Sequence, residues 1–155
     1  MTLAEMNHLI IGSETACLGF TDEEGRPEIR RVFSTWHKGI GTHLISTNTS
    51  SEHVQKLLHN SAACLYFDNC KKFEGLSLKG KAIVHFDHVY KAMLWNEGDE
   101  KYYPAGVDDE DYCVIEFIAD EGRFYRYDGK GDISKTEIEN HDRNETFKHY
   151  TEFDH

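Results

Sequence analysis

The chain has 155 residues, of which 39% are hydrophobic and 12% aromatic, which is enough apolar material for one compact core. Its formal net charge of −11 opposes binding to a nucleic-acid backbone or an anionic lipid surface, so we expect neither partner. No stretch approaches the ~20 apolar residues of a membrane span, and the first residues lack the basic segment of a signal peptide, which predicts a cytoplasmic protein.

The first predicted element is a short amphipathic helix. Thr2 and Glu5 have the spacing of a capping box, apolar residues then recur at helical intervals, and Gly12 is a natural end. An apolar run over residues 15–21, an acidic turn and Pro27 at the start of the next strand then predict a β-hairpin.

The strand after Pro27 mixes apolar and polar side chains on both of its faces. One face carries Ile29, Arg31, Phe33 and Thr35, and the other carries Arg30, Val32, Ser34 and Trp36. A strand between core and solvent would separate the two kinds of side chain. We therefore expect one face of this strand to meet a ligand or another subunit.

The middle of the chain continues with short strands and helices. After a glycine turn we predict a strand over residues 43–47, a helix over residues 51–59 and a buried strand over residues 62–68. Strict alternation from residue 76 to residue 86 predicts a further strand. Asp87 is then placed to cap a helix.

Two more strands complete the pattern. They are predicted over residues 112–118 and 123–127, joined by a turn at residues 120–122, after an aromatic-rich loop at residues 102–106. No element is assigned from Gly129 onward, where the composition becomes polar and charged. At least six short strands with short helices between them predict a mainly β fold, a small β-barrel.

Most catalytic and metal motifs are absent from the sequence. There is no G-x-S-x-G elbow, no phosphate-binding glycine loop and no Cys or His spacing of the zinc type. The histidines at residues 85–88 are expected on a solvated strand edge, and we predict no metal site. The cysteines lie far apart, mostly in apolar runs, which predicts reduced thiols at Cys17, Cys64, Cys70 and Cys113.

The segment over residues 47–53 places four hydroxyl side chains between a strand and the start of a helix. Free N–H groups and the positive end of the helix dipole favour a bound anion at such a point. Arg30 offers a permanent charge for phosphate, and antiparallel pairing of its strand with the strand over residues 43–47 would bring it close. The alternative is ordinary N-capping by a box of Thr49 and Glu52.

The order of these features resembles the pyridoxamine 5'-phosphate oxidase-like flavin-binding split barrels, with the general stress protein 26 type as the closest branch. The resemblance spans about residues 3–128 and rests on residues 25–30, 47–57, 62–68, 80–82, 94–95, 103–106 and 108–109. It implies one FMN-binding domain over residues 1–128, a split β-barrel of six or more antiparallel strands with short flanking helices. Residues 129–155 would be a polar C-terminal extension of that domain.

The resemblance also implies the site residues. Flavin contacts carry over to Arg30, Arg31 and Val32, and phosphate contacts carry over to Thr47, Asn48, Ser51 and position 53. His53 stands where the family usually has Lys, so we expect weaker and pH-dependent flavin binding, because a neutral imidazole has no fixed charge. Trp95, with Tyr125 and Tyr127, is expected to stack near the flavin ring, with core or interface packing as the alternative.

Family members are homodimers with flavin at the subunit interface, which would explain the mixed strand after Pro27. The expected function is that of an FMN-dependent oxidoreductase using NAD(P)H or another small redox substrate, with the chemistry belonging to the flavin. No residue is nominated as a catalytic acid or base. Because the tail lacks the R-x-H motif of true pyridoxamine 5'-phosphate oxidases, that specific activity is not expected. The alternatives are a non-enzymatic stress module that sequesters flavin, and haem or a deazaflavin in the same cleft.

Overall fold

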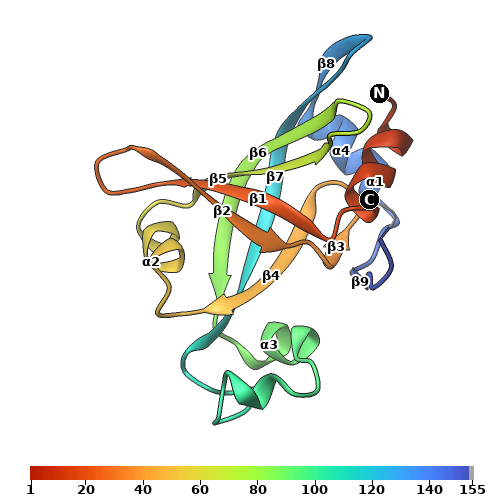
Figure 1. Ribbon diagram of the computed structural model, residues 1–155. Coiled ribbons are helices and arrows are strands. Elements are labelled where there is room, and N and C mark those ends of the chain that lie inside the picture. The colour runs from red at the N-terminus through yellow and green to blue at the C-terminus, as the bar shows by residue number, and fades with distance from the viewer. Residues whose placement is uncertain (154–155) are drawn as a thin grey trace.

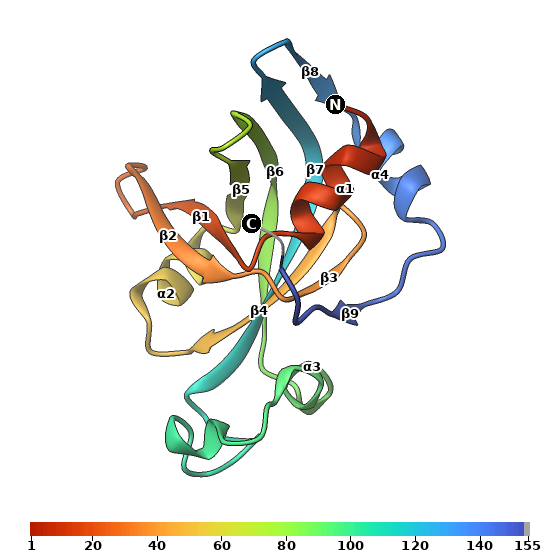
Figure 2. The same ribbon diagram turned by 45° about the vertical axis from the view of Figure 1, so that its right-hand side comes forward.

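The fold is built on one curled antiparallel sheet (Figure 1, Figure 2). The computed structural model describes residues 1–153. Neighbouring strands follow the order β2-β1-β5-β6-β7-β4-β3-β9, and β8 pairs with β7 beside that path. The strands are β1 (Thr15–Thr21), β2 (Pro27–Phe33), β3 (Trp36–Lys38), β4 (Thr42–Asn48), β5 (Ala62–Asn69), β6 (Glu74–His85), β7 (Tyr112–Arg126), β8 (Gly129–Ile133) and β9 (Lys148–His149). The predicted mainly β split barrel is confirmed.

Short helices flank this sheet in the described part of the chain. They are α1 (Leu3–Ile11), α2 (Glu52–His59), α3 (His88–Leu94), α4 (Lys135–Asp142) and the 3₁₀ turn η1 (Asp99–Lys101). The capping box predicted for the first helix is confirmed, because Thr2 Oγ1 accepts from the Glu5 N–H and Glu5 Oε1 accepts from the Thr2 N–H, both at 3.1 Å. Asp87 caps α3 as predicted, accepting a hydrogen bond from the Tyr90 N–H.

The hydrophobic core fills the inside of the curled sheet. Side chains alternate along β1, so that Leu18 and its even-numbered neighbours face inward. Helix α1 covers the core with Met6, Leu9 and Ile10, which are all buried. Because these side chains recur at helical spacing, the helix is held by its apolar stripe.

Strand β7 is continuous where the sequence predicts two strands and a turn at residues 120–122. This prediction is wrong because β6 pairs with β7 along almost its whole length. The register shifts between Lys79 and Gly80, which lets the pair bend. A Cβ atom at position 80 would lie 1.9 Å from the carbonyl oxygen of Ile118, so the close approach of the two strands requires glycine.

The residues after position 129, to which the sequence assigns no element, form β8, α4 and β9. Ile133 and Ile138 enter the main core, with 4% and 2% of their surface exposed. Ser134 and Glu137 form a second capping box at the start of α4. The spacing of Ser134 and Glu137 is present in the sequence, but the polar residues around it give no apolar pattern that would indicate a helix.

The C-terminal segment binds the turn between β3 and β4 and the outer edge of β3. Asp142 accepts hydrogen bonds from the N–H groups of Ile40 at 2.9 Å and Gly41 at 2.8 Å. Strand β9 pairs with β3, and the ring of His149 stacks on Trp36 at 4.7 Å. The polar tail is therefore an integral part of the folded domain.

Two histidines are buried beside this segment. His37 is 0% exposed, its ring stacks on Tyr150 at 4.3 Å, and both of its ring nitrogens lack a hydrogen-bond partner within the described residues. Burial lowers the pKa of His37 to about 3, with the nearby His43 as a second cause. Burial also lowers the pKa of His43 to about 4, although its Nε2 makes a hydrogen bond with the Ile40 carbonyl. Both rings are neutral at pH 7.

The four cysteine thiols are free: Cys113 is buried, Cys17 and Cys64 are half-buried, and Cys70 is exposed.

Over residues 1–153, none of the helices combines the length and the apolar character needed to cross a membrane.

Candidate functional site

The site residues predicted from the sequence lie on three parts of the fold. Strand β2 carries Arg30, Arg31 and Val32, the turn from β4 to α2 carries Thr47, Asn48, Ser51 and His53, and Trp95 directly follows α3. The predicted pairing of the Arg30 strand with the strand over residues 43–47 is wrong. Strand β2 pairs with β1, while β4 has β3 along one edge and β7 along the other, which leaves β2 no free edge of β4.

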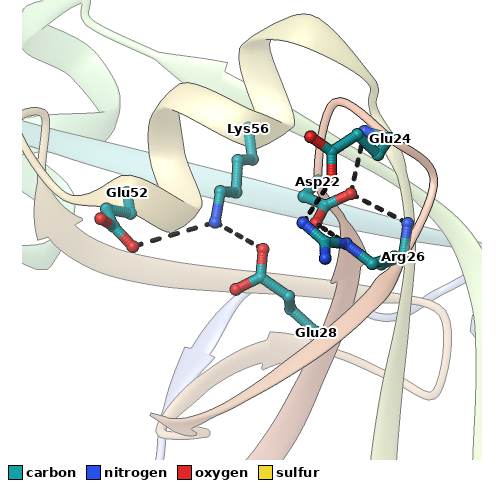
Figure 3. Close-up of polar contacts among 6 residues, drawn as sticks. All are labelled: Asp22, Glu24, Arg26, Glu28, Glu52 and Lys56. Atoms are coloured by element: carbon teal, nitrogen blue, oxygen red, sulfur yellow. Dashed lines mark hydrogen bonds and ion pairs between the residues drawn. The ribbon is translucent and has the colours of Figure 1, made fainter.

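Helix α2 brings β2 and the turn together instead. The helix packs against β1, the partner of β2, and the rings of Phe20 and His53 lie 6.3 Å apart. Lys56 Nζ donates a hydrogen bond to Glu28 Oε2 at 2.5 Å, which ties α2 to β2 (Figure 3). Arg30 lies on the same face of β2 as Glu28, because side chains alternate along a strand.

His53 is the point where these elements meet. It is 2% exposed, and its Nε2 lies 3.0 Å from Thr47 Oγ1 in a hydrogen bond. Burial lowers the pKa of His53 to about 4, and the positive charge of Arg30 is the second cause. The imidazole is therefore neutral at pH 7.

The start of α2 lacks the side-chain cap that the alternative interpretation requires. The cap residue is Ser51 and makes no side-chain hydrogen bond, so the proposed box of Thr49 and Glu52 is wrong. The first N–H groups of the helix thus have no side-chain acceptor, and they lie at the positive end of the helix dipole. An anion bound at this point would find backbone donors and the Thr47 hydroxyl, with Arg30 on the strand that Lys56 and Glu28 tie to this helix.

Sequence reasoning missed Asp111, which lies directly before β7 and contacts three successive residues of the turn. Its Oδ1 accepts from the Ser50 N–H at 2.8 Å and its Oδ2 accepts from Asn48 Nδ2 at 3.1 Å. Its main-chain carbonyl accepts from the Thr49 N–H at 2.7 Å. The 61 positions between Ser50 and Asp111 leave no local sequence signal for these contacts.

Arg31 and Val32 face in opposite directions on β2. Arg31 Nη1 donates to Thr15 Oγ1 at 3.1 Å, and the side chain lines a surface cavity of about 370 Å³. Val32 is buried in the main core. Of the two, Arg31 alone offers its side chain to a ligand, and Val32 would contact one through its backbone.

Two of the three aromatic residues predicted near a flavin ring, Trp95 and Tyr125, pack against other aromatic rings. Trp95 lies edge-on to Tyr112 at 5.4 Å and 6.2 Å from Tyr103, whose hydroxyl donates to Asn48 Oδ1 at 3.0 Å. Trp95 is thereby linked to the turn through one intermediate residue. Tyr125 packs edge-on against Phe73 and forms a hydroxyl hydrogen bond with Tyr66, and Tyr127 is exposed.

A shallow groove of about 580 Å³ crosses the outer face of the sheet beside β2. Its walls are mostly apolar or glycine: Gly19, Phe20, Pro27, Ile29, Ala62, Ala63, Cys64 and Gly80, with Thr21, Glu28 and Lys79. Ile29 and Phe33 are 72% and 66% exposed on the same strand. The mixed strand identified from the sequence thus presents apolar side chains to its surroundings in a single chain.

The side chain of His85 is held in place by Glu116 and Tyr90. Its Nε2 lies 2.9 Å from Glu116 Oε1, and its ring stacks on Tyr90 at 3.9 Å. No group of three or more His, Cys, Asp or Glu side chains within residues 1–153 is arranged to hold a metal ion.

A curled antiparallel sheet defines the class of split β-barrels (Figure 1). Helix α1 packs over its core, and α2 follows β4 and precedes β5 in the chain. Residues 2–143 match the family described as pyridoxamine 5'-phosphate oxidase like. The chain belongs to this pyridoxamine 5'-phosphate oxidase-like family, in its general stress protein 26-like branch.

Solved structures agree with this assignment. A Clostridium acetobutylicum protein related to general stress protein 26 is 38% identical, with a TM-score of 0.77 over 88% of this chain and 96% of that chain. The general stress protein 26 of Bacillus anthracis is 18% identical, with a TM-score of 0.67 over 86% and 99% of the two chains. A heme binding protein from Mycobacterium smegmatis is 18% identical, with a TM-score of 0.70 over 89% and 60%. Comparison with curated proteins gives no match.

Proposed function

We propose that the chain binds the phosphate of FMN at the start of α2. The observation that carries this proposal is the hydrogen bond between Thr47 and His53 beside a helix start that has no side-chain cap, with Arg30 on the strand that Lys56 and Glu28 tie to the same helix. Arg30 would supply the charge, and Thr47 and the first N–H groups of α2 would supply hydrogen bonds. Asn48 and Ser51 border this place on the turn.

The second part of the proposal is a homodimer with the flavin at the interface. Strand β2 is the last strand at one end of the sheet, and its exposed Ile29 and Phe33 lie beside the apolar groove. These features support a second copy packed on this face. Arg31 and the aromatic group around Trp95 would then complete the walls around the flavin ring.

We further propose that the protein is an oxidoreductase that uses NAD(P)H or another small redox substrate. The bound flavin would supply the hydride and electron transfer. The chain's own residues would hold its phosphate and exclude water. The alternatives are a module that sequesters flavin without turnover, and a haem or deazaflavin protein, since the similar Mycobacterium smegmatis protein binds heme. Four free thiols support a reducing compartment, and we propose the cytoplasm.

The visible absorption spectrum of the purified protein, with mass identification of any released ligand, separates these functions. Titration with FMN, haem and a deazaflavin then ranks the cofactors, and NAD(P)H oxidation with an acceptor separates enzyme from binder. A colourless protein that does not bind added FMN would remove the main proposal.

Substitution of Arg30 tests the site itself. Arg30→Met should weaken FMN binding by about ten- to 150-fold, since a charge-assisted hydrogen bond contributes ~1.5–3 kcal/mol and each ~1.4 kcal/mol is a factor of ten. Arg26→Met is the matched control, because Arg26 belongs to the same hairpin and its Nε contacts Asp22 at 2.9 Å (Figure 3). Equal loss in both variants would exclude a specific role for Arg30.

The low pKa of His53 changes the expected effect of this residue. With a pKa of about 4, the imidazole stays neutral from pH 5.5 to 8, so its pH dependence should appear only below about pH 5. His53→Lys should strengthen FMN binding throughout that range, because it adds a charge beside the phosphate. Equal dissociation constants for the variant and the wild type would contradict this role of position 53.

A further inference from the structure

Hydrogen bonds within the segment between α3 and β7 fix the position of Asp111. Its N–H donates to Asp109 Oδ1 at 3.0 Å, and the other oxygen of Asp109 accepts from the Ala105 N–H at 3.0 Å. The main-chain carbonyl of Asp109 accepts from Lys91 Nζ, also at 3.0 Å, and Lys91 is 5% exposed. The segment from α3 to β7 is thus a fixed support for the Asp111 carboxylate.

Asp111, through its carboxylate and its main-chain carbonyl, divides the donors of the turn into two groups. The N–H groups of Thr49 and Ser50 and the amide of Asn48 are committed to Asp111. The first N–H groups of α2, which include that of His53, are not capped by the Ser51 side chain. The donors that remain for a ligand are therefore those of the first turn of α2, because the Ser51 N–H donates to the Asn48 carbonyl.

Tyr103 strengthens the same arrangement. Its hydroxyl donates to Asn48 Oδ1, while Asn48 Nδ2 donates to Asp111, so both ends of this amide are fixed. The hydrogen bonds from Ser50 and Asn48 also lower the pKa of Asp111, which keeps its carboxylate ionised and accepting at neutral pH. Order of this kind in the free protein reduces the entropy lost when a ligand binds.

We propose that Asp111 is a positioning residue for the phosphate site, which fixes residues 48–50 and thereby holds Thr47 and the start of α2 in place to receive a phosphate. This inference rests on the proposed FMN binding. It adds a residue that touches neither phosphate nor flavin ring and acts through the turn alone.

Two flavins test the role of Asp111, because riboflavin has the ring of FMN without the phosphate. Asp111→Ala should raise the FMN dissociation constant about tenfold and leave riboflavin binding within about twofold of wild type. Asp111→Asn should recover most of the FMN affinity, because its amide oxygen can accept from Ser50. Asp108→Ala is the control, since Asp108 carries the same charge in the same loop and pairs with His88.

Hydrogen–deuterium exchange of the flavin-free protein gives a second readout. Asp111→Ala should speed exchange over residues 47–55 and leave the sheet unchanged. Tyr103→Phe, which keeps the ring, should show a smaller change in the same direction and covers the case in which Asp111→Ala does not fold.

Equal losses of FMN and riboflavin affinity, or unchanged exchange over residues 47–55, would overturn the positioning role. If wild type binds neither flavin while exchange still rises in Asp111→Ala, the proposed function fails and the positioning of a phosphate fails with it. If wild type binds FMN and Asp111→Ala binds it equally well, only the role of Asp111 is refuted.

Discussion

Replacement of His37 by phenylalanine should make the protein more resistant to acid. The His37 ring is fully buried and stacked on Tyr150, and its two nitrogens have no partner among the described residues. Phenylalanine keeps the stacked ring and removes the two unpaired polar atoms. The substitution therefore isolates the cost of protonating a buried imidazole.

The sign and size of the effect follow from the pKa of His37. Its ordinary value of 6.5 applies to the unfolded chain, and the folded value is about 3. Between these values the unfolded state binds the extra proton, so stability falls as the pH falls below 6.5. From pH 7 to pH 4.5 the loss amounts to about 3 kcal/mol, since each pKa unit corresponds to ~1.4 kcal/mol. His43 adds a separate loss in the same direction, which the variant retains.

Urea unfolding of wild type and His37→Phe at pH 7 and pH 4.5 measures this difference. The variant should lose about 3 kcal/mol less than wild type over that interval. His59→Gln serves as the control, because this ring is exposed. Parallel losses in wild type and His37→Phe would refute the assignment of acid sensitivity to His37.

Three further substitutions test the architecture. Ile138→Ala should lower the free energy of unfolding by about 2–5 kcal/mol, since this side chain fills the core from α4, and a loss below about 1 kcal/mol in urea unfolding would contradict that packing. Gly80→Ala should lower the melting temperature, because the new Cβ meets the Ile118 carbonyl, and an unchanged melting temperature would argue against the close approach. Asp142→Ala should speed proteolysis of the segment after β8, since two N–H groups lose their acceptor, and wild-type resistance would show that the anchor lies elsewhere.

Local sequence signals predicted most of the individual elements. Thr2 with Glu5 and Asp87 were recognised as helix caps because capping depends on residues three apart or fewer. The alternation from residue 76 correctly predicted β6, because the burial of side chains along a strand repeats every second residue. These signals need no knowledge of distant contacts.

The errors concern contacts between distant residues. The sequence predicted a direct pairing of the Arg30 strand with β4, but β2 pairs with β1 and is tied to α2 by the Lys56–Glu28 contact. The contacts of Asp111 with the turn and of Asp142 with Ile40 join residues 61 and 102 positions apart. No local sequence pattern around these residues indicates such contacts, so only the folded structure reveals the contacts.

The anchoring of the β3–β4 turn by Asp142 has a consequence for synthesis in the cell. The acceptor for the N–H groups of Ile40 and Gly41 is translated about 100 residues after them, and Ile138 comes from the same late segment. A ribosome that has made the first strands cannot yet close this end of the barrel, because long-range contacts form only after both partners exist. The nascent chain should therefore expose this turn and the neighbouring part of the core until α4 has been synthesised.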